Sequence, residues 1–341
     1  MASVVQPQVD CSTAEELIHA LSPLGPHFKN CGPKDQWLFR GQGRDDPLIP
    51  TLFRSTGRFA QLRSVGNYEQ TLIAERDLLV RFFEIADKRG LLLPDDSQSM
   101  RATLATLQSH RGTELLRSKF ALAEGWEPAS LALSLAALAQ HYGVPTRLLD
   151  WTRKPYFAAY FAAESAWRSI QNREREKKIL QENCTDGNQV KAIDGSSLLV
   201  VWAFYFPELG RRHEVYQDSD PIRVITAPSA TNPNLSAQQG VFTWLNWRRT
   251  GEANGKYLPM DQVLERLANQ ARPDADDVDK LIIGCKIRRF TLPTSEVDAL
   301  LYLLAKVDVT PSAVYPGYSS ILSDLEMEVR WWHPATVSSG R

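Results

Sequence analysis

The stretch Gln140–Phe161 reads QHYGVPTRLLDWTRKPYFAAYF. Its leucine, tyrosine, tryptophan and phenylalanine residues surround the polar residues His141, Arg147 and Asp150. An apolar core does not need such groups, and burying them without partners costs free energy. We therefore expect each of them to be paired inside the fold or to line a site.

The sequence on both sides of these residues predicts buried helices. Residues 129–142 are apolar nearly all round, which is typical of a buried helix, and Gly143 fits the left-handed position that ends one. Thr152 can cap a second helix, whose first turn tolerates Pro155. The three ionisable residues are therefore expected in or beside one short connection, where a rigid scaffold can fix polar groups.

This stretch carries a family resemblance. HYGVPTRLLDWT, followed by AAYFAA, resembles the signature of FRG-domain proteins, whose Phe-Arg-Gly stands here in WLFRGQ at Trp37–Gln42. QQGVFTW and YPGYSSILSDLE resemble later segments of the family, so the resemblance covers residues 36–328. FRG-domain proteins resemble bacterial and phage accessory proteins, which implies a role in phage defence, conflict or stress response.

Composition narrows the class of protein. The chain has 341 residues, 43% of them hydrophobic and 23% charged, as in soluble globular proteins. A net charge of −1 argues against a broad basic surface for nucleic acid. The four cysteines (Cys11, Cys31, Cys184 and Cys285) lack metal-ligand spacing, and no apolar stretch is long enough to span a membrane. Without a signal-peptide pattern, we expect a cytoplasmic protein with no evident metal and no membrane contact.

The order of predicted elements indicates an α+β fold. Helical patterns dominate the first half, and the strongest strand pattern follows at residues 196–206. Further strand patterns lie at residues 221–229, 240–249 and 280–290. We predict a single large domain with a helical N-terminal half and a mostly antiparallel sheet in its C-terminal half. The predicted divisions are an N-terminal tail and helix at 1–35, an FRG-type domain at 36–332 with a solvated insertion at 171–196, and a C-terminal tail at 333–341.

Arg40 and Gln42, in the WLFRGQ segment, are the first candidates for ligand binding. Arg40 offers a planar fork that suits phosphate or carboxylate, and Gly41 and Gly43 beside it would let a ligand approach. The alternative is a strand arginine paired with a carboxylate. Gln42 is assigned to the same ligand site.

His141 bonds free helix-end carbonyls in one interpretation and serves as an acid, base or ligand donor in the other. Arg147 and Asp150 can pair across the turn; we assign Asp150 as the structural partner and Arg147 as facing a ligand. Trp151 is assigned to the core. Gln239 is either an ordinary edge residue or a donor to a ligand beside the Phe-Arg-Gly strand.

Three hypotheses for function follow. An arginine, a threonine and a late glutamate, in that order, resemble the arginine-type ADP-ribosyltransferases. In this hypothesis Arg40 would hold the pyrophosphate of NAD, and Thr243 would orient Glu326 or Glu328 to stabilise an oxocarbenium-like transition state. Otherwise these two glutamates are solvated surface charges. The second hypothesis is a pocket that binds a nucleotide-like small molecule without turnover, and the third is a scaffold for a protein partner.

Overall fold

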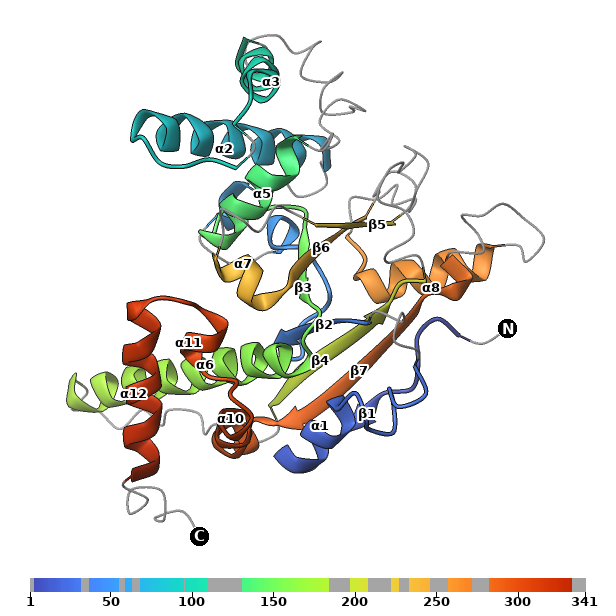
Figure 1. Cartoon of the computed structure of the whole chain (residues 1–341), viewed down its shortest axis with the longest axis vertical. Coiled ribbons are helices and arrows are strands. Elements are labelled where there is room, and N and C mark those ends of the chain that lie inside the picture. The colour runs from blue at the N-terminus through green and yellow to red at the C-terminus, as the bar shows by residue number, and fades with distance from the viewer. Residues whose placement is uncertain are drawn as a thin grey trace.

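The fold is built on a mixed seven-stranded sheet (Figure 1). The computed structural model describes residues 3–31, 37–54, 59–62, 68–94, 96–109, 131–183, 197–207, 222–226, 233–245, 257–271 and 282–332. The strands are β1 (Val9–Asp10), β2 (Trp37–Gln42), β3 (Leu149–Thr152), β4 (Leu198–Tyr205), β5 (Ile222–Ile225), β6 (Gly240–Leu245) and β7 (Lys286–Pro293). Their order is β1-β7-β4-β2-β3-β6-β5, in which only the β1–β7 pair is parallel.

Helices cover both faces and one end of this sheet. The longer ones are α1 (Ala14–Leu21), α2 (Tyr68–Lys88), α3 (Gln98–Ser109), α5 (Leu131–His141), α6 (Pro155–Asn183), α8 (Met260–Gln270), α10 (Val297–Lys306) and α12 (Tyr318–Trp332). The shorter ones are η1 (Thr51–Phe53), η2 (Ala60–Leu62), α7 (Pro233–Gln238), η3 (Thr294–Glu296) and α11 (Pro311–Val314).

Helix α6 lies directly on strand β2. Ala158 and Ala162 of α6 are fully buried, and a Cβ added to Gly41 would lie 1.8 Å from the Ala158 carbonyl oxygen. A Cβ at Gly43 would meet the Ala166 nitrogen at 2.4 Å. The glycines beside Arg40 are therefore required by the close approach of a helix backbone, whereas the sequence interpretation gave them to ligand approach.

Three apolar clusters hold the layers together. The α6 side of the sheet also takes α1 and α10, and the opposite side takes η1 and α8. The third cluster joins α2, α3 and α5 to the β5–β6 end of the sheet (Figure 1). Along β2, Phe39 faces the α6 side and Leu38 the other, because successive side chains of a strand point to opposite faces of the sheet.

The predicted α+β class is confirmed, but the division into halves is not what the structure has. β2 and β3 come from the first half of the chain and lie in the middle of the sheet. Leu149–Thr152, expected in a connection between helices, is a strand that pairs with β6. Thr152 does act at the start of α6, because its hydroxyl accepts from the Lys154 amide at 3.0 Å.

Two of the predicted divisions contain regular elements of the fold. Val9–Asp10 pairs with β7, so this part of the predicted N-terminal tail belongs to the sheet. Within the predicted insertion, α6 continues to Asn183. The predicted C-terminal tail lies outside the described residues. None of the described helices has the length and apolar character needed to cross a membrane.

Candidate functional site

A pocket of about 380 Å³ brings the two signature segments of the chain together. β2 contributes Phe39, Arg40 and Gly41, while the 140–152 stretch contributes residues on both sides of its turn. The remaining walls come from η1, α5, α6, α7, β6 and the residue after α11. The lining residues outside β2 are Thr51, Ala137, Gln140, His141, Asp150, Trp151, Thr152, Phe161, Leu235, Gln238, Gly240, Val241, Phe242 and Tyr315.

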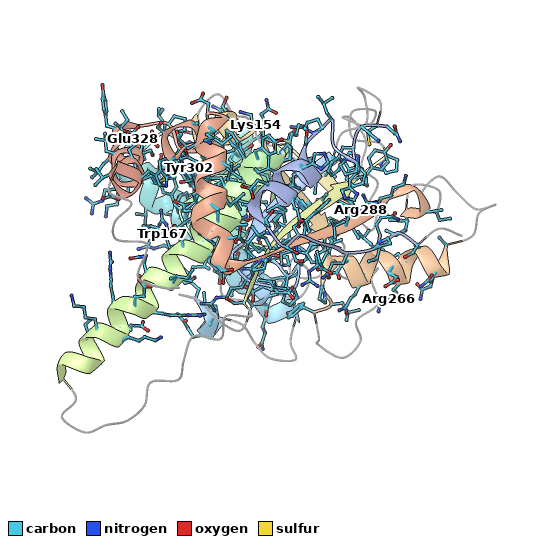
Figure 2. All side chains as sticks on the ribbon, turned by 90° about the horizontal axis from the view of Figure 1, so that it is seen from below. Lys154, Trp167, Arg266, Arg288, Tyr302 and Glu328 are labelled. Carbon is cyan, nitrogen blue, oxygen red and sulfur yellow. The ribbon has the colours of Figure 1, made fainter. Side chains whose placement is uncertain are left out.

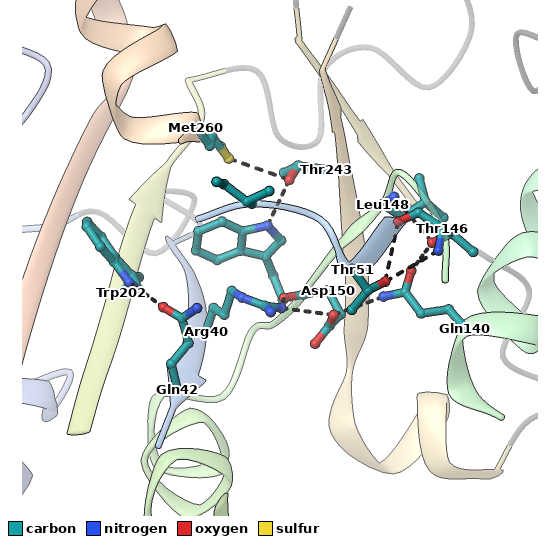
Figure 3. A network of polar contacts seen from close by, with 12 residues as sticks. Arg40, Gln42, Thr51, Gln140, Thr146, Leu148, Asp150, Trp202, Thr243 and Met260 are labelled. Atoms are coloured by element: carbon teal, nitrogen blue, oxygen red, sulfur yellow. Dashed lines mark hydrogen bonds and ion pairs between the residues drawn. The ribbon is translucent and has the colours of Figure 1, made fainter. Parts of the chain in front are cut away.

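Arg40 and Asp150 form the polar centre of this pocket (Figure 3). Nη1 of Arg40 donates to the Asp150 backbone oxygen and lies 2.8 Å from its carboxylate oxygen Oδ1. The two side chains come from strands on neighbouring positions in the sheet, β2 and β3. Of the two sequence interpretations of Arg40, the strand arginine paired with a carboxylate is therefore the one that the structure has.

Gln140 holds the same carboxylate from the other side. Its Nε2 donates to Asp150 Oδ1 at 2.9 Å, and its Oε1 accepts from the Thr146 hydroxyl. Thr146 is in turn tied to Thr51 of η1 through backbone and hydroxyl groups. The helix end, the turn and η1 thus fix one carboxylate orientation (Figure 3).

The surroundings of Asp150 keep it ionised. Packing around the carboxyl group alone would raise its pKa, but the charge and hydrogen bond of Arg40 outweigh this and hold the pKa of Asp150 below its usual value. Arg54 adds a second positive charge nearby. The pKa of Arg54 itself is lowered by burial and by the charge of Arg40, which places the two guanidinium groups near each other.

The Asp150 carboxylate is open to a ligand. Its side chain is 60% exposed, in contrast to 9% for Arg40. Oδ1 accepts from Arg40 and Gln140, and among the described residues the only further donor to the carboxylate is the backbone amide of Asp150 itself. The pocket therefore presents a hydrogen-bond acceptor with a full negative charge, held in place by groups that are themselves covered.

Arg147 makes a separate ion pair away from the pocket wall. Its Nε donates to Glu75 Oε2 of α2 at 2.5 Å, and its backbone amide donates to Oε1 at 2.7 Å. The two side chains are 7% and 2% exposed. The expected pairing of Arg147 with Asp150 is wrong, because Glu75 reaches the turn from a helix 72 residues earlier. Arg147 does not line the described pocket.

Two other candidates, Thr243 and Gln42, are buried and each accepts a hydrogen bond from a tryptophan indole. Thr243 is 1% exposed; its hydroxyl accepts from the Trp151 indole at 2.9 Å and donates to Met260 Sδ at 3.7 Å. Gln42 is 7% exposed and accepts from the Trp202 indole at 2.8 Å. Both polar groups satisfy buried indole nitrogens, which need a partner inside a core. Trp151 is buried, as its assignment to the core requires, although one part of it reaches the pocket.

The two late glutamates lie on α12, away from this pocket. Glu326 and Glu328 are exposed, and Glu326 lines a different pocket of about 360 Å³ with Arg168 and Arg175 of α6. The structure therefore does not bring Arg40, Thr243 and a glutamate into one described site.

His141 and Gln239 differ in their relation to the pocket. His141 lines it, and its Nε2 lies 2.7 Å from the Asn234 side-chain nitrogen; partial burial lowers its pKa. Because an amide nitrogen is a donor, Nε2 is the acceptor and the ring is neutral in this contact. Gln239 adopts a left-handed conformation with φ of 48° before β6 and is exposed, and its neighbours Gln238 and Gly240 line the pocket instead.

Several residues of the site were not among the sequence candidates. Gln140 precedes the histidine of the motif but was not assigned a role, and Tyr315 opens the YPGYSSILSDLE segment. Phe161 sits in the aromatic part of α6 and reaches Tyr315 with ring centroids 6.0 Å apart. Glu75 had a usable signal, because it falls three residues after Leu72 and four before Leu79 on the apolar stripe of its helix.

A comparison with models of protein families gives a match to the part of the chain that contains the Arg40–Asp150 pair. The model of the FRG domain matches residues 35–170, which include β2, Glu75, α5 and β3, whereas the later QQGVFTW and YPGYSSILSDLE segments fall outside the match. No curated protein and no solved structure matches the chain. The predicted resemblance is thus confirmed over residues 35–170, which match the FRG domain and supply the Arg40–Asp150 pair.

Proposed function

We propose that the Arg40–Asp150 pocket binds a small nucleotide-like molecule. The observation that carries this proposal is the exposed carboxylate of Asp150, set among aromatic walls in a concave site. Ligand pockets are typically about 300–1,000 Å³, mostly apolar, with a few fixed polar groups that orient the ligand. A volume of about 380 Å³ suits a nucleoside-sized group.

The chemistry of the lining favours the ribose and base of such a ligand. A carboxylate accepts hydrogen bonds from ribose hydroxyls, as acidic residues do in dinucleotide-binding proteins. Phe161, Phe242 and Tyr315 offer aromatic surface for a base, and Gln238 adds a polar group at the rim. Arg40 orients the carboxylate in this proposal, in place of the pyrophosphate-holding role that its position in the sequence suggested.

Binding without turnover is the function that this geometry supports best. The transfer hypothesis assigned its catalytic roles to Thr243, Glu326 and Glu328, of which the first is buried and the other two are on α12. If NAD is the ligand, Asp150 is the carboxylate placed to contact its ribose. Binding of a nucleotide-like signal molecule during bacterial or phage conflict is the role that fits both the pocket and the family resemblance.

The test is a calorimetric comparison of NAD, ADP-ribose, adenosine and adenine with the purified chain. We expect adenosine and ADP-ribose to bind and adenine to bind more weakly, because adenine lacks the hydroxyls that Asp150 would accept from. The variant that removes the proposed acceptor charge is Asp150→Asn. Its control is Asp308→Asn, which makes the same change at an exposed aspartate outside the pocket and should leave binding unchanged. No heat from any of the four ligands would reject the proposal.

A further inference from the structure

Helix α12 carries an apolar stripe on its exposed side. The stripe consists of Tyr318, Ile321, Leu322, Leu325 and Val329, which are 93%, 48%, 60%, 48% and 47% exposed. The spacing of i, i+3, i+4, i+7 and i+11 puts all five on one face of a helix. Single exposed apolar residues are common on proteins, but a continuous stripe of this kind marks an interaction surface.

The opposite side of α12 already has its partners. Met327 packs against the apolar cluster on the α6 side of the sheet. The ring centroids of Trp331 and of Tyr302 on α10 lie 5.4 Å apart. The stripe is thus the side that remains after α12 has packed on its own chain.

The charges beside the stripe indicate the kind of partner. With 3.6 residues per turn, Glu326 and Glu328 lie about 80° to either side of the centre of the stripe. Two α12 helices packed against each other would bring like charges together at both edges, as mismatched flanking positions do in coiled coils. A partner helix with positive flanks is favoured instead.

The C-terminal part of α6 has this character. Residues 172–179 contain Arg173, Arg175, Lys177 and Lys178 against two glutamates, and Ile179 is 57% exposed. Figure 2 shows the last part of α6, well beyond Trp167, extending past the other elements, whereas Asn172 and Arg175 still line a pocket with Glu326 of α12. Long basic side chains can also cover apolar surface with their methylene stems while their charges stay in water.

We propose that two copies of this chain associate reciprocally, with the end of α6 from each copy on the α12 stripe of the other. Such an interface is symmetric, because each copy supplies both halves. The lengths are compatible: residues 172–183 span about 18 Å and the 15 residues of α12 about 22 Å at 1.5 Å per residue. The association is separate from ligand binding, since none of these residues lines the Arg40–Asp150 pocket.

The first test is the mass of the full chain in solution, measured by sedimentation velocity over a range of concentrations. We expect a dimer that weakens as salt rises, and a monomer for Leu322→Glu/Leu325→Glu. The matched control is Leu91→Glu/Leu92→Glu, a pair of exposed leucines 62% and 89% exposed after α2, which should leave the dimer intact. Circular dichroism of each variant separates loss of association from loss of folding.

A charge exchange then identifies the occupant of the stripe. Lys177→Glu/Lys178→Glu should weaken the dimer, and adding Glu326→Lys/Glu328→Lys in the same chain should restore it. A wild-type monomer at all concentrations overturns the proposal. So does a dimer that ignores the leucine substitutions, or one that needs the leucines but does not respond to either charge exchange.

Discussion

An arginine beside a carboxylate occurs twice around the 140–152 stretch, with different surroundings. Arg147 and Glu75 are 7% and 2% exposed, and the carboxylate also takes a backbone amide of the turn. Arg40 is equally covered at 9%, but its partner Asp150 is 60% exposed and faces a pocket. A fully enclosed pair fixes the position of a chain segment, whereas a half-open pair holds a charged group ready for a ligand.

Removing one member of the enclosed pair gives the largest expected effect on stability. Arg147→Ala leaves the Glu75 carboxylate buried without its main cation, and such losses typically cost about 3–5 kcal/mol. We expect this decrease in the free energy of unfolding in urea titrations. A decrease below about 1 kcal/mol would show that the pair does not hold the turn, and would remove the contrast with Asp150.

The glycine of the Phe-Arg-Gly segment gives the next largest effect. In Gly41→Ala the new Cβ would meet the Ala158 carbonyl oxygen at 1.8 Å, so β2 and α6 must separate. Overpacking of this kind costs about 1–3 kcal/mol. Thermal unfolding should show a lower midpoint for Gly41→Ala than for Gly143→Asn, which keeps a left-handed conformation at an open position with φ of 87°. Equal midpoints would contradict the packing role of Gly41.

Asp150→Asn should affect stability much less than Arg147→Ala. The side chain keeps its shape and can still accept from Arg40, and the charge that is lost belongs to a carboxylate that is 60% exposed, for which ion pairs contribute about 0–1 kcal/mol. Desolvation of the carboxyl group favours its neutral form, but the charge of Arg40 outweighs this effect. The pKa of Asp150 is therefore lowered in the folded chain. The contribution of the charge is therefore present above the unfolded value of about 3.9 and is lost as pH falls through the lowered folded value. Urea titrations at several pH values should show the wild type and Asp150→Asn converging in strongly acidic solution.

A pH-dependent effect at His141 is the smallest expected. Partial burial lowers its pKa, so the unfolded chain binds a proton more readily than the folded one. Stability should fall as pH decreases through the unfolded value of about 6.5, and part of this slope should be absent in His141→Asn. His27 also has a pKa lowered by burial and affects stability in the same direction. The measurement is therefore the difference between the wild type and His141→Asn in the slope of unfolding free energy against pH. Parallel slopes would show that His141 is protonated as readily in the folded chain.

The sequence indicated the location of the site better than the role of each residue in it. His141, Arg147 and Asp150 stood out because they are polar residues in an apolar stretch, and two of them line the pocket. The partners could not be assigned, since Glu75 and Arg40 reach the stretch from 72 and 110 residues away. Local spacing favoured pairing Arg147 with Asp150, whereas the strand conformation of Leu149–Thr152 turns Asp150 toward β2.

The fold was predictable to a similar degree. Periodicity and composition predicted most of the longer helices, several strands and the α+β class. The place of β2 and β3 at the centre of the sheet depends on pairings with β4 and β6, which no local pattern encodes. Thr243 was given a site role by the resemblance to the arginine-type ADP-ribosyltransferases, and Gln42 was assigned to the ligand site beside Arg40. Their partners are buried indoles of distant tryptophans, so only the packed structure could assign them.

The most direct test of the contrast between the two pairs is a calorimetric titration of ADP-ribose into the wild type and into Asp150→Asn at pH 7. We predict binding by the wild type and a loss of at least about tenfold in affinity for Asp150→Asn, because hydrogen bonds to a charged group contribute about 1.5–3 kcal/mol. The variant should remain folded, as its urea titration would verify. Equal affinity of the two proteins would contradict the account, since the exposed carboxylate would then have no part in recognition.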